Sequence, residues 1–372
     1  MAVGMRFDDE VRVNILNALR KPYSIQPNIS KIQKLTGLHQ LTIKNSLKFL
    51  KQEGVVLGFI PNVSPKATGI RLVTIMLLDI DLTDKETFNH FMKHALTDPF
   101  VFSVNRIIGS SNWNLMIEFI STSVEEIDDN LNKWFFERIP NIASFVRNKQ
   151  ILYCVPAVHK SGSVYDAAIN LLLEKNKKNK NNEEKGMQAD DAVRVKILDT
   201  LRKPGALSIN ASQIQKYTKY HMSTIKASLK FLKEKSILTR VLPNISSQKL
   251  GFKLMPINIY VVDTSNKKFM QALNNAFKED KNVFSVTELV GELDWNLVSF
   301  QLYEGVKEFH HDQNYKYLEK IKNYYSGVRN RMTLYASGPI VELEEKGKTV
   351  KYDSGSRSVA LVNVLAFKQG LK

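Results

Sequence analysis

The sequence predicts an α+β protein made by tandem duplication of one unit that has two differently patterned halves. Shifted by 182 positions, the 372-residue chain aligns with itself without a gap from Asp8 to about Tyr153. In both copies a helix-rich half comes first, and a half that alternates strands with helices follows. A repeat of this length is not a solenoid, whose units span about 20–50 residues, so we expect two copies of one pair of domains.

The composition is that of a basic globular protein. Hydrophobic residues make up 43% of the chain and charged residues 24%, and the formal net charge is +16, which favours a polyanionic partner. No apolar run approaches the about 20 residues that a membrane helix needs, and we expect no signal peptide. The single cysteine, Cys154, excludes an internal disulfide and any Cys-based zinc site. We therefore expect a cytoplasmic protein that associates with the nucleoid and does not bind membranes.

The first half of each copy has the pattern of three helices and a β-hairpin. In the first copy these helices are expected at Asp8–Arg20, at Ser30–Leu35 and from about Gln40 to Glu53. The segment "GVVLGFIPNV" then predicts two short strands that form a wing. This order is typical of a winged helix-turn-helix domain.

The second half alternates strands and helices in the order βαββαβ. That order predicts a ferredoxin-like sandwich. The expected strands of the first copy are Arg71–Asp81, Val101–Ile108, Trp113–Ile120 and Ser144–Cys154, and those of the second are Phe252–Asp263, Val283–Val290, Trp295–Tyr303 and Ser326–Ala336.

These patterns also give the domain boundaries. Between the copies, residues 175–188 are rich in Lys and Asn, and we interpret them as a mobile linker. The expected divisions are residues 1–64 and 189–246 for the winged helix-turn-helix domains, 65–158 and 247–340 for the ferredoxin-like domains, 159–188 for an apolar helix with the linker, and 341–372 for a C-terminal tail with an apolar helix.

The third helix carries a lysine-rich face in both copies. Ile43, Leu47 and Leu50 fall in one sector of the helix and predict its core face. No acidic residue occurs from His39 to Gln52 or from His221 to Lys233, so the lysines lack helical partners and are free to meet phosphates. The alternative is a solvated lysine face. The candidate DNA-binding residues are His39, Gln40, Leu41, Lys44, Asn45, Lys48 and Lys51 in the first copy, and His221, Met222, Ser223, Lys226, Ala227, Lys230, Lys233 and the wing residue Arg240 in the second.

The two helices differ where sequence-reading side chains are expected. Reading positions lie near the N-terminal half of such a helix, and three of the four differ between the copies. Gln and Asn can bond adenine with two hydrogen bonds, whereas Met and Ala offer only apolar contact. The hypothesis is therefore two non-identical half-sites. The differing pairs are Gln40 and Met222, Leu41 and Ser223, and Asn45 and Ala227.

The element order and several motifs resemble the Lrp/AsnC (feast/famine) family of transcription regulators. The resemblance rests on "LTIKNSLKFLKQEGVVLGFIPNVSPKATG" at Leu41–Gly69 and on its copy, which ends in "PNISSQKLGF" at Pro243–Phe252. "GELDWNL" at Gly291–Leu297 is similar to the family's Gly-x-x-Asp-aromatic turn. The resemblance covers nearly the whole of each repeat. Family members are usually single units that dimerise, whereas this chain fuses two.

The resemblance implies a regulator of transcription that binds double-stranded DNA. Its ferredoxin-like halves would pair as an intrachain pseudo-dimer and bind a small effector such as an amino acid; a further homodimer stays open. For Asn112 and Asp294, a role in capping the turn after glycine is the alternative. We also expect Arg147 and Arg329 to form ion pairs at a strand edge. The candidate effector residues are Gly109, Asn112, Gly291 and Asp294.

Other chemistry finds little support in the motifs. His90 and His94 have a metal-ligand spacing, but no third ligand is near them in the sequence, so we predict no metal. There is no P-loop, no Gly-x-Gly-x-x-Gly after a strand and no Gly-x-Ser-x-Gly, so we predict no cofactor and no enzyme. Two alternatives remain. One is an architectural DNA-binding protein without an effector, and the other is an enzyme on the same fold that resembles siroheme decarboxylases.

Overall fold

The structure groups the helix-rich halves of the two copies in one compact unit and their strand-rich halves in another. It is a computed structural model, and it describes residues 29–63, 72–155, 211–245, 253–339 and 342–351 with short gaps, together with Val11 and Ile15. One compact unit comprises residues 1–69, 163–251 and 356–372, and the other comprises residues 70–162 and 252–355. Each unit therefore contains matching segments from both copies. The expected linker and the apolar helices near it and in the tail lie outside the described residues.

The first unit repeats a helix, a turn, a helix and a strand. In the first copy these are α2 (Ile29–Thr36), α3 (Gln40–Gln52) and β1 (Val56–Val63). In the second they are α9 (Ala211–Thr218), α10 (Met222–Glu234) and β6 (Leu238–Ile245). The first helix expected in each copy lies outside the described residues apart from Val11 and the fully buried Ile15.

The turn before the third helix keeps its geometry in both copies. Gly37 has a φ of +70°, and Lys219 at the equivalent position has a φ of +63°. This left-handed conformation is strained for a lysine, so the surrounding fold imposes it. Thr36 and Thr218 each close the preceding helix by donating a hydroxyl hydrogen bond to the carbonyl four residues before, at 2.8 and 2.7 Å.

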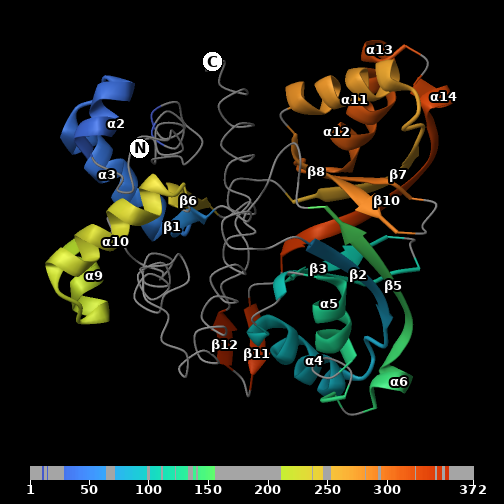
Figure 1. Cartoon of the computed structure of the whole chain (residues 1–372), viewed down its shortest axis with the longest axis horizontal. Helices are drawn as coiled ribbons and strands as arrows, with labels where there is room; N and C mark the ends of the chain where they lie inside the picture. The colour runs from blue at the N-terminus through green and yellow to red at the C-terminus, as the bar shows by residue number, and fades with distance from the viewer. Residues whose placement is uncertain are drawn as a thin grey trace, which may run out of the picture. The chain divides into compact units, whose positions relative to one another are not determined.

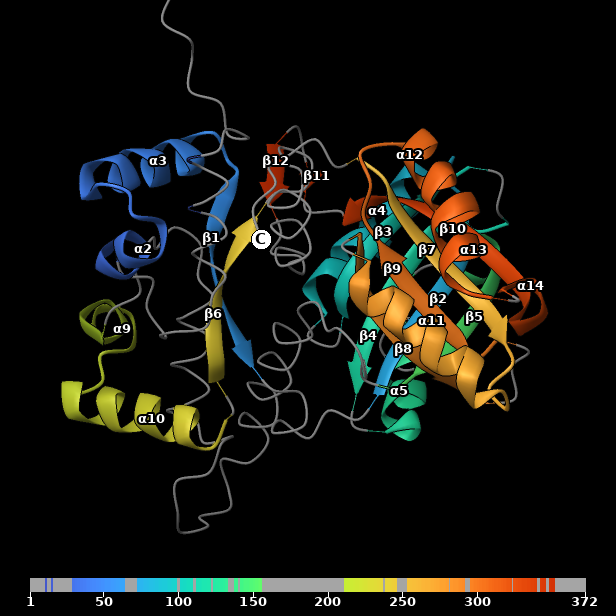
Figure 2. The same cartoon turned by 90° about the horizontal axis from the view of Figure 1, so that it is seen from above.

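The predicted wing hairpin is wrong in one respect. Each copy contributes one continuous strand instead of two short ones, and β1 pairs antiparallel with β6 of the other copy. In the backbone register Ile60 lies opposite Leu242. Figure 2 shows the two strands side by side, with α3 and α10 at opposite ends of the pair.

The second unit contains two βαββαβ sets, as predicted. The first copy supplies four neighbouring strands, in the order β3-β4-β2-β5, and three described helices. Its elements are β2 (Leu72–Ile80), α4 (Lys85–Thr97), β3 (Val101–Ile108), β4 (Leu115–Ser121), α5 (Val124–Asn130), α6 (Ile142–Phe145) and β5 (Val146–Cys154).

The second copy repeats this order with a longer helical segment. Its elements are β7 (Met255–Val262), α11 (Lys267–Glu279), β8 (Val283–Val290), β9 (Leu297–Gln301), α12 (Val306–His311), the π-helix η3 (Asp312–Lys316), α13 (Tyr317–Lys320), α14 (Tyr324–Gly327) and β10 (Val328–Pro339), followed by the hairpin β11 (Glu342–Glu345) and β12 (Lys348–Lys351).

Eight strands of the second unit close into one antiparallel barrel. Their order is β10-β3-β4-β2-β5-β8-β9-β7. The two copies join where Cys154 of β5 lies opposite Leu289 of β8, and where Tyr335 of β10 lies opposite Ile108 of β3. Figure 1 shows α4 and α5 against the first-copy strands and α11 and α12 against the second-copy strands.

Both faces of β2 and β4 are buried. In β2, Met76, Leu78 and Ile80 pack with Phe91 of α4, so they face the helices. Because side chains alternate along a strand, Ile75 and Leu77 face the barrel interior, where they are also buried. The sequences of β2 and β4 are therefore apolar at most positions. None of the helices in the described part of the chain is long and apolar enough to cross a membrane.

Candidate functional site

The third helices, α3 and α10, have one buried face and one exposed face. His39 begins α3, and its Nδ1 accepts a hydrogen bond from the backbone N–H of Leu41 at 3.3 Å. Ile43, Leu47 and Leu50 are buried, which confirms the predicted core face. The spacing of these three positions turns the intervening side chains outward.

The lysines of both helices lie on the exposed side. Lys44 and Lys48 in α3, and Lys226 and Lys233 in α10, are exposed and form no ion pair within the described part of the chain. Lys51 is also exposed. A guanidinium or ammonium without a carboxylate partner retains its donors for an external phosphate.

One acidic residue next to the lysines of α10 was overlooked in the sequence-based prediction. Glu234 follows the acid-free stretch directly and pairs with Lys230 across one helical turn, at 3.8 Å. Both side chains are mostly exposed, so the pair is worth about 0.3–0.5 kcal/mol and breaks readily. The first copy has Gln52 at this position and its acidic residue one place later, at Glu53, where the second copy has Lys235.

The expected reading positions also face outward. Asn45 and Ala227 are both exposed, and Leu41 is exposed to 60%. Gln40 donates from Nε2 to Gln33 Oε1 at 3.1 Å on the surface. The other predicted residues of the second copy are exposed at His221 and Ser223 and half-buried at Met222. Arg240 lies in β6, opposite Asn62 in the backbone register.

The glycine turns of the second unit have a conformation that requires glycine. Gly109 and Gly291 have φ values of +105° and +118°, a region that side chains rarely adopt. Asn112 is exposed beside the first turn, and Asp294 lies outside the described residues. The structure thus accounts for the glycines as turn residues.

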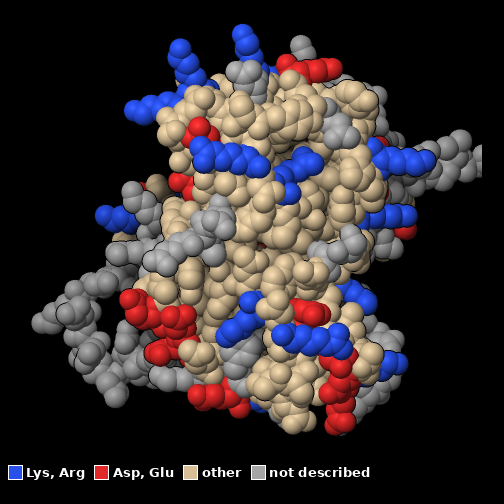
Figure 3. Space-filling view, turned by 90° about the vertical axis from the view of Figure 1, so that its right-hand side faces the viewer, with Lys and Arg blue, Asp and Glu red and all other residues tan. Residues whose placement is uncertain are grey.

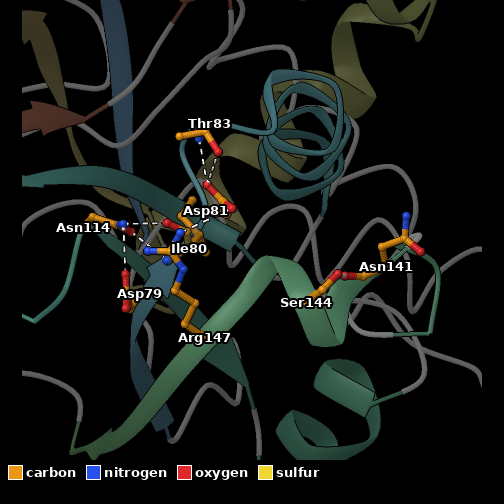
Figure 4. A network of polar contacts seen from close by, with 8 residues as sticks. All are labelled: Asp79, Ile80, Asp81, Thr83, Asn114, Asn141, Ser144 and Arg147. Carbon is orange, nitrogen blue, oxygen red and sulfur yellow. Dashed lines mark hydrogen bonds and ion pairs between the residues drawn. The ribbon is translucent and has the colours of Figure 1, made fainter.

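The asparagine that stabilises this motif is Asn114, two residues after Asn112. Asn114 accepts a hydrogen bond from the Ile80 N–H at 3.0 Å and donates to the Ile80 carbonyl at 2.7 Å and to Asp79 at 3.2 Å. Asn296 makes the same pair of bonds to Val262, at 2.9 and 2.7 Å. Figure 4 shows this amide holding the end of β2. The repeated "WN" in both copies was the signal for it.

The predicted strand-edge ion pairs are confirmed. Arg147 pairs with Asp81 at 3.3 Å, and Arg329 pairs with Asp263 at 3.6 Å. Hydrogen bonds from the hydroxyl and backbone N–H of Thr83, together with Arg147, lower the pKa of Asp81. Figure 4 shows Thr83 and Arg147 on two sides of this carboxylate. These groups lock the turn after β2, which is a structural role.

The two histidines with metal-ligand spacing lie on α4. His90 is exposed and His94 is half-buried, and the second copy has Ala272 and Ala276 at these positions. In the described segments, no three His, Cys, Asp or Glu side chains gather in a way that could hold a metal ion.

Comparison with known proteins shows a likeness in fold. The crystal structure of the siroheme decarboxylase NirDL matches with a TM-score of 0.53 at 13% sequence identity, over 96% of this chain and 97% of that one. The same enzyme in complex with an iron-uroporphyrin III analogue matches with a TM-score of 0.54, also at 13% identity, over 97% of this chain and 98% of that one. The likeness therefore spans both copies.

Transcription regulators match smaller parts of the chain. A transcriptional regulator from Neisseria meningitidis in complex with L-Met is 16% identical, and the match covers 42% of this chain and 95% of that one, with a TM-score of 0.35. AsnC of E. coli is 17% identical over 39% of this chain and 90% of that one, with a TM-score of 0.31. No family model matches the sequence, and no curated protein matches it.

These matches correct one sequence-based expectation. The prediction that the chain is not an enzyme was wrong as a firm statement, because a structure that matches it over nearly its whole length is an enzyme. The prediction was based on the absence of short catalytic motifs. An active site can also be built from side chains that lie far apart in the sequence, and no short motif reveals such a site. The chain is a mixed α/β protein with an antiparallel sheet, and it shares its overall fold with the siroheme decarboxylase NirDL.

Proposed function

We propose that the chain binds double-stranded DNA through α3 and α10, one half-site for each helix. The observation that carries this proposal is the row of outward-facing lysines that recurs at equivalent positions in both helices. On the face drawn in Figure 3, by contrast, basic and acidic side chains are interspersed. Phosphate contacts from lysine fix the position of a protein on DNA and supply affinity without sequence preference.

The strand pair β1–β6 supports two coordinated half-sites. Each reading helix leads within a few residues into its strand, α3 into β1 and α10 into β6. Because the strands pair with each other, the two helices are connected through one small sheet and not only through the chain. A regulator that acts as an intrachain pseudo-dimer needs such a connection to keep a constant half-site spacing.

The differing side chains on the reading faces support non-identical half-sites. Asn45 can both donate to and accept from an adenine edge, whereas Ala227 can only contact a thymine methyl group. Both positions are exposed, so neither is needed for the core. The shared lysines would then supply the affinity and the differing residues the sequence preference, with an effector as a further control.

Salt-dependent DNA binding tests the proposal. For a duplex of about 30 base pairs, the logarithm of the binding constant should fall with the logarithm of the salt concentration by about 0.9 for each phosphate contact. The variant Lys44→Ala/Lys48→Ala should reduce that slope by up to about two such steps. The variant Lys267→Ala/Lys268→Ala in the exposed first turn of α11 is the matched control. Equal slopes for both variants would overturn the proposal.

A second candidate function is decarboxylation of a siroheme-like tetrapyrrole. The observation that favours it is the match to the siroheme decarboxylase over nearly the whole of both chains. In each such step the bond to a side-chain carboxyl carbon breaks, carbon dioxide leaves and a proton replaces it. Mass spectrometry of siroheme incubated with the purified protein tests this: loss of carbon dioxide supports it, and unchanged siroheme eliminates it.

A further inference from the structure

The second copy has a polar layer where the first copy has a hydrophobic core. On the helix-facing side of the first-copy sheet, five positions are apolar and at most 3% exposed. The equivalent positions of the second copy are equally buried, yet four are polar, and the fifth is Tyr260, which packs in the hydrophobic cluster of this copy and adds a hydroxyl group. The pairs are Met76 and Asn258, Leu78 and Tyr260, Ile117 and Ser299, Phe119 and Gln301, and Leu131 and Gln313.

These polar groups form a chain of hydrogen bonds from the surface to the interior. Arg331 Nη1 donates to Gln313 Oε1 at 2.7 Å, and Gln313 Nε2 donates to Gln301 Oε1 at 3.1 Å. The chain continues from Gln301 to Ser299 at 3.5 Å and from Ser299 to Tyr260 at 3.4 Å. The last two distances are long for hydrogen bonds between such groups, so the inner part of the chain is only weakly satisfied.

One buried donor in this layer has no partner in the part of the chain that the structure describes. Asn258 accepts a hydrogen bond from the Thr333 hydroxyl at 2.7 Å, but its Nδ2 has no partner among the described residues. Asn258 is fully buried. An unsatisfied buried amide costs about 1–3 kcal/mol, and native proteins keep few of them.

The fold itself does not require these polar residues. The first copy builds the same sheet and helices with Met76, Ile117 and Phe119 and so avoids the cost of burying polar groups at these positions, although Thr74 Oγ1 and Asn105 Oδ1 elsewhere in its sheet are also buried without a partner among the described residues. A tandem copy is an internal control, because chain order and strand register are the same. Retention of a partly satisfied polar layer in one copy therefore indicates a role outside folding.

The positive charge of Arg331, at the outer end of the layer, favours an anionic ligand. Arg331 is exposed, and its hydrogen-bond partners within the described part of the chain are Gln313 and Tyr324, neither of them acidic. A guanidinium has five donors, and a carboxylate binds it with two parallel hydrogen bonds. Burial raises the pKa of Tyr260 and of Tyr324, so both stay neutral hydroxyls that can donate or accept.

The segment that covers the layer is a π-helix. Gln313 belongs to η3, which interrupts the run from α12 to α13. The first copy has a π-helical turn at the equivalent residues Leu131 and Asn132, so the turn belongs to the shared fold and the copies differ in the side chain that it carries. Here that turn carries the one side chain that connects Arg331 to the interior amides.

We propose that the polar layer between the sheet and η3 of the second copy binds a small organic carboxylate, which the first copy does not bind. Arg331 takes the carboxylate, and Gln313, Gln301 and Asn258 bond the polar body of the ligand. On binding, the carboxylate replaces Gln313 Oε1 at Arg331, and the unsatisfied amide of Asn258 gains an acceptor. This site is separate from the reading helices and does not depend on DNA binding.

Exchange of second-copy residues for first-copy residues tests the site. Thermal unfolding of the full chain would be followed with single 2-amino, 2-oxo and 2-hydroxy carboxylic acids as probes. At least one should raise the unfolding temperature in a saturable manner. The variant Gln301→Phe/Gln313→Leu, which installs the first-copy residues, should weaken that binding at least tenfold, and Lys149→Met at the first-copy position of Arg331 should leave it unchanged.

A second variant separates a binding role from a structural one. Asn258→Met/Thr333→Ile also installs first-copy residues and removes the unsatisfied amide. If the layer exists for a ligand, this variant unfolds at a higher temperature and loses binding. If the layer is structural, it unfolds at a lower temperature. The proposal is overturned if no probe binds the wild-type chain, if the variants bind as well as the wild type, or if siroheme alone binds.

Discussion

The aromatic ring of Phe269 occupies the space into which a side chain at Gly327 would project. A Cβ at residue 327 would overlap three ring atoms of Phe269. The first copy solves the same packing problem in reverse, with Thr87 on the helix and the buried ring of Phe145 at the later position. That ring lies 5.5 Å from Phe91. The two copies thus carry the aromatic ring at opposite members of this aligned pair of positions.

This relationship predicts a compensating pair of substitutions. Gly327→Ala alone should lower the free energy of unfolding by about 1–3 kcal/mol, because the core must shift to admit the methyl group. The exchange Phe269→Thr/Gly327→Phe installs the first-copy arrangement and should recover most of the lost stability. Denaturant unfolding measures both, and equal losses for the single and double variants would show that the copies do not pack equivalently.

Acid should weaken the turns after β2 and β7. Hydrogen bonds from Ser265 and the charge of Arg329 lower the pKa of Asp263, as Thr83 and Arg147 do for Asp81. Both carboxylates have folded-state pKa values below their ordinary 3.8, so their contribution to stability is complete above that pH. It is lost as the pH falls through the folded values.

The acid effect depends on the hydroxyl donors. Thr83→Val/Ser265→Ala should make the loss of unfolding free energy below pH 3.8 shallower than in the wild type, because the carboxylates then titrate closer to their ordinary pKa. Urea unfolding at a series of pH values measures this. An unchanged dependence on pH would mean that these bonds do not stabilise the folded carboxylates.

The single cysteine should be unreactive in the folded protein. Burial and the nearby Glu118 raise the pKa of the Cys154 thiol, so the reactive thiolate is scarce. Alkylation with iodoacetamide should be slow in buffer and complete in denaturant. Ala143→Cys adds an exposed thiol on α6 as the control, which should react at once. Rapid alkylation of native Cys154 would contradict the packing of β5 against β8.

A crosslink tests the strand pair between the copies. Ile60 and Leu242 lie opposite each other in the β1–β6 register, and opposed residues of antiparallel strands have Cβ atoms about 4.5–5.5 Å apart. In a Cys154→Ser background, Ile60→Cys/Leu242→Cys should form an intrachain disulfide that mass spectrometry detects. Ile60→Cys/Arg240→Cys, two residues out of register, should not. Equal yields would contradict the register.

The sequence predicted the elements whose signal is local. The 3.6-residue spacing of Ile43, Leu47 and Leu50 and the order βαββαβ follow from short-range patterns, and the structure confirms both. The sequence did not predict the pairing of β1 with β6, because the same strand-forming residues suit a hairpin within one copy and a strand pair between the two copies. Only the tertiary arrangement decides between them.

The polar layer of the second copy was also missed, although the alignment contained it. Gln301 and Gln313 stand where Phe119 and Leu131 do, but a polar residue in an expected strand or helix is normally taken as solvent-facing. Only the strand register shows that these positions face the helices. The possibility of enzyme activity was also missed, because catalytic side chains that are far apart in the sequence form no short motif.

Selection of binding sites from random DNA tests the central claim most directly. The wild-type chain should enrich a two-part site with non-identical halves, because the exposed reading positions of α3 and α10 differ. The variant Gln40→Met/Leu41→Ser/Asn45→Ala makes those positions identical and should enrich a palindrome of the second half-site. A palindrome for the wild type, or no enriched sequence for either protein at moderate salt, would contradict the account.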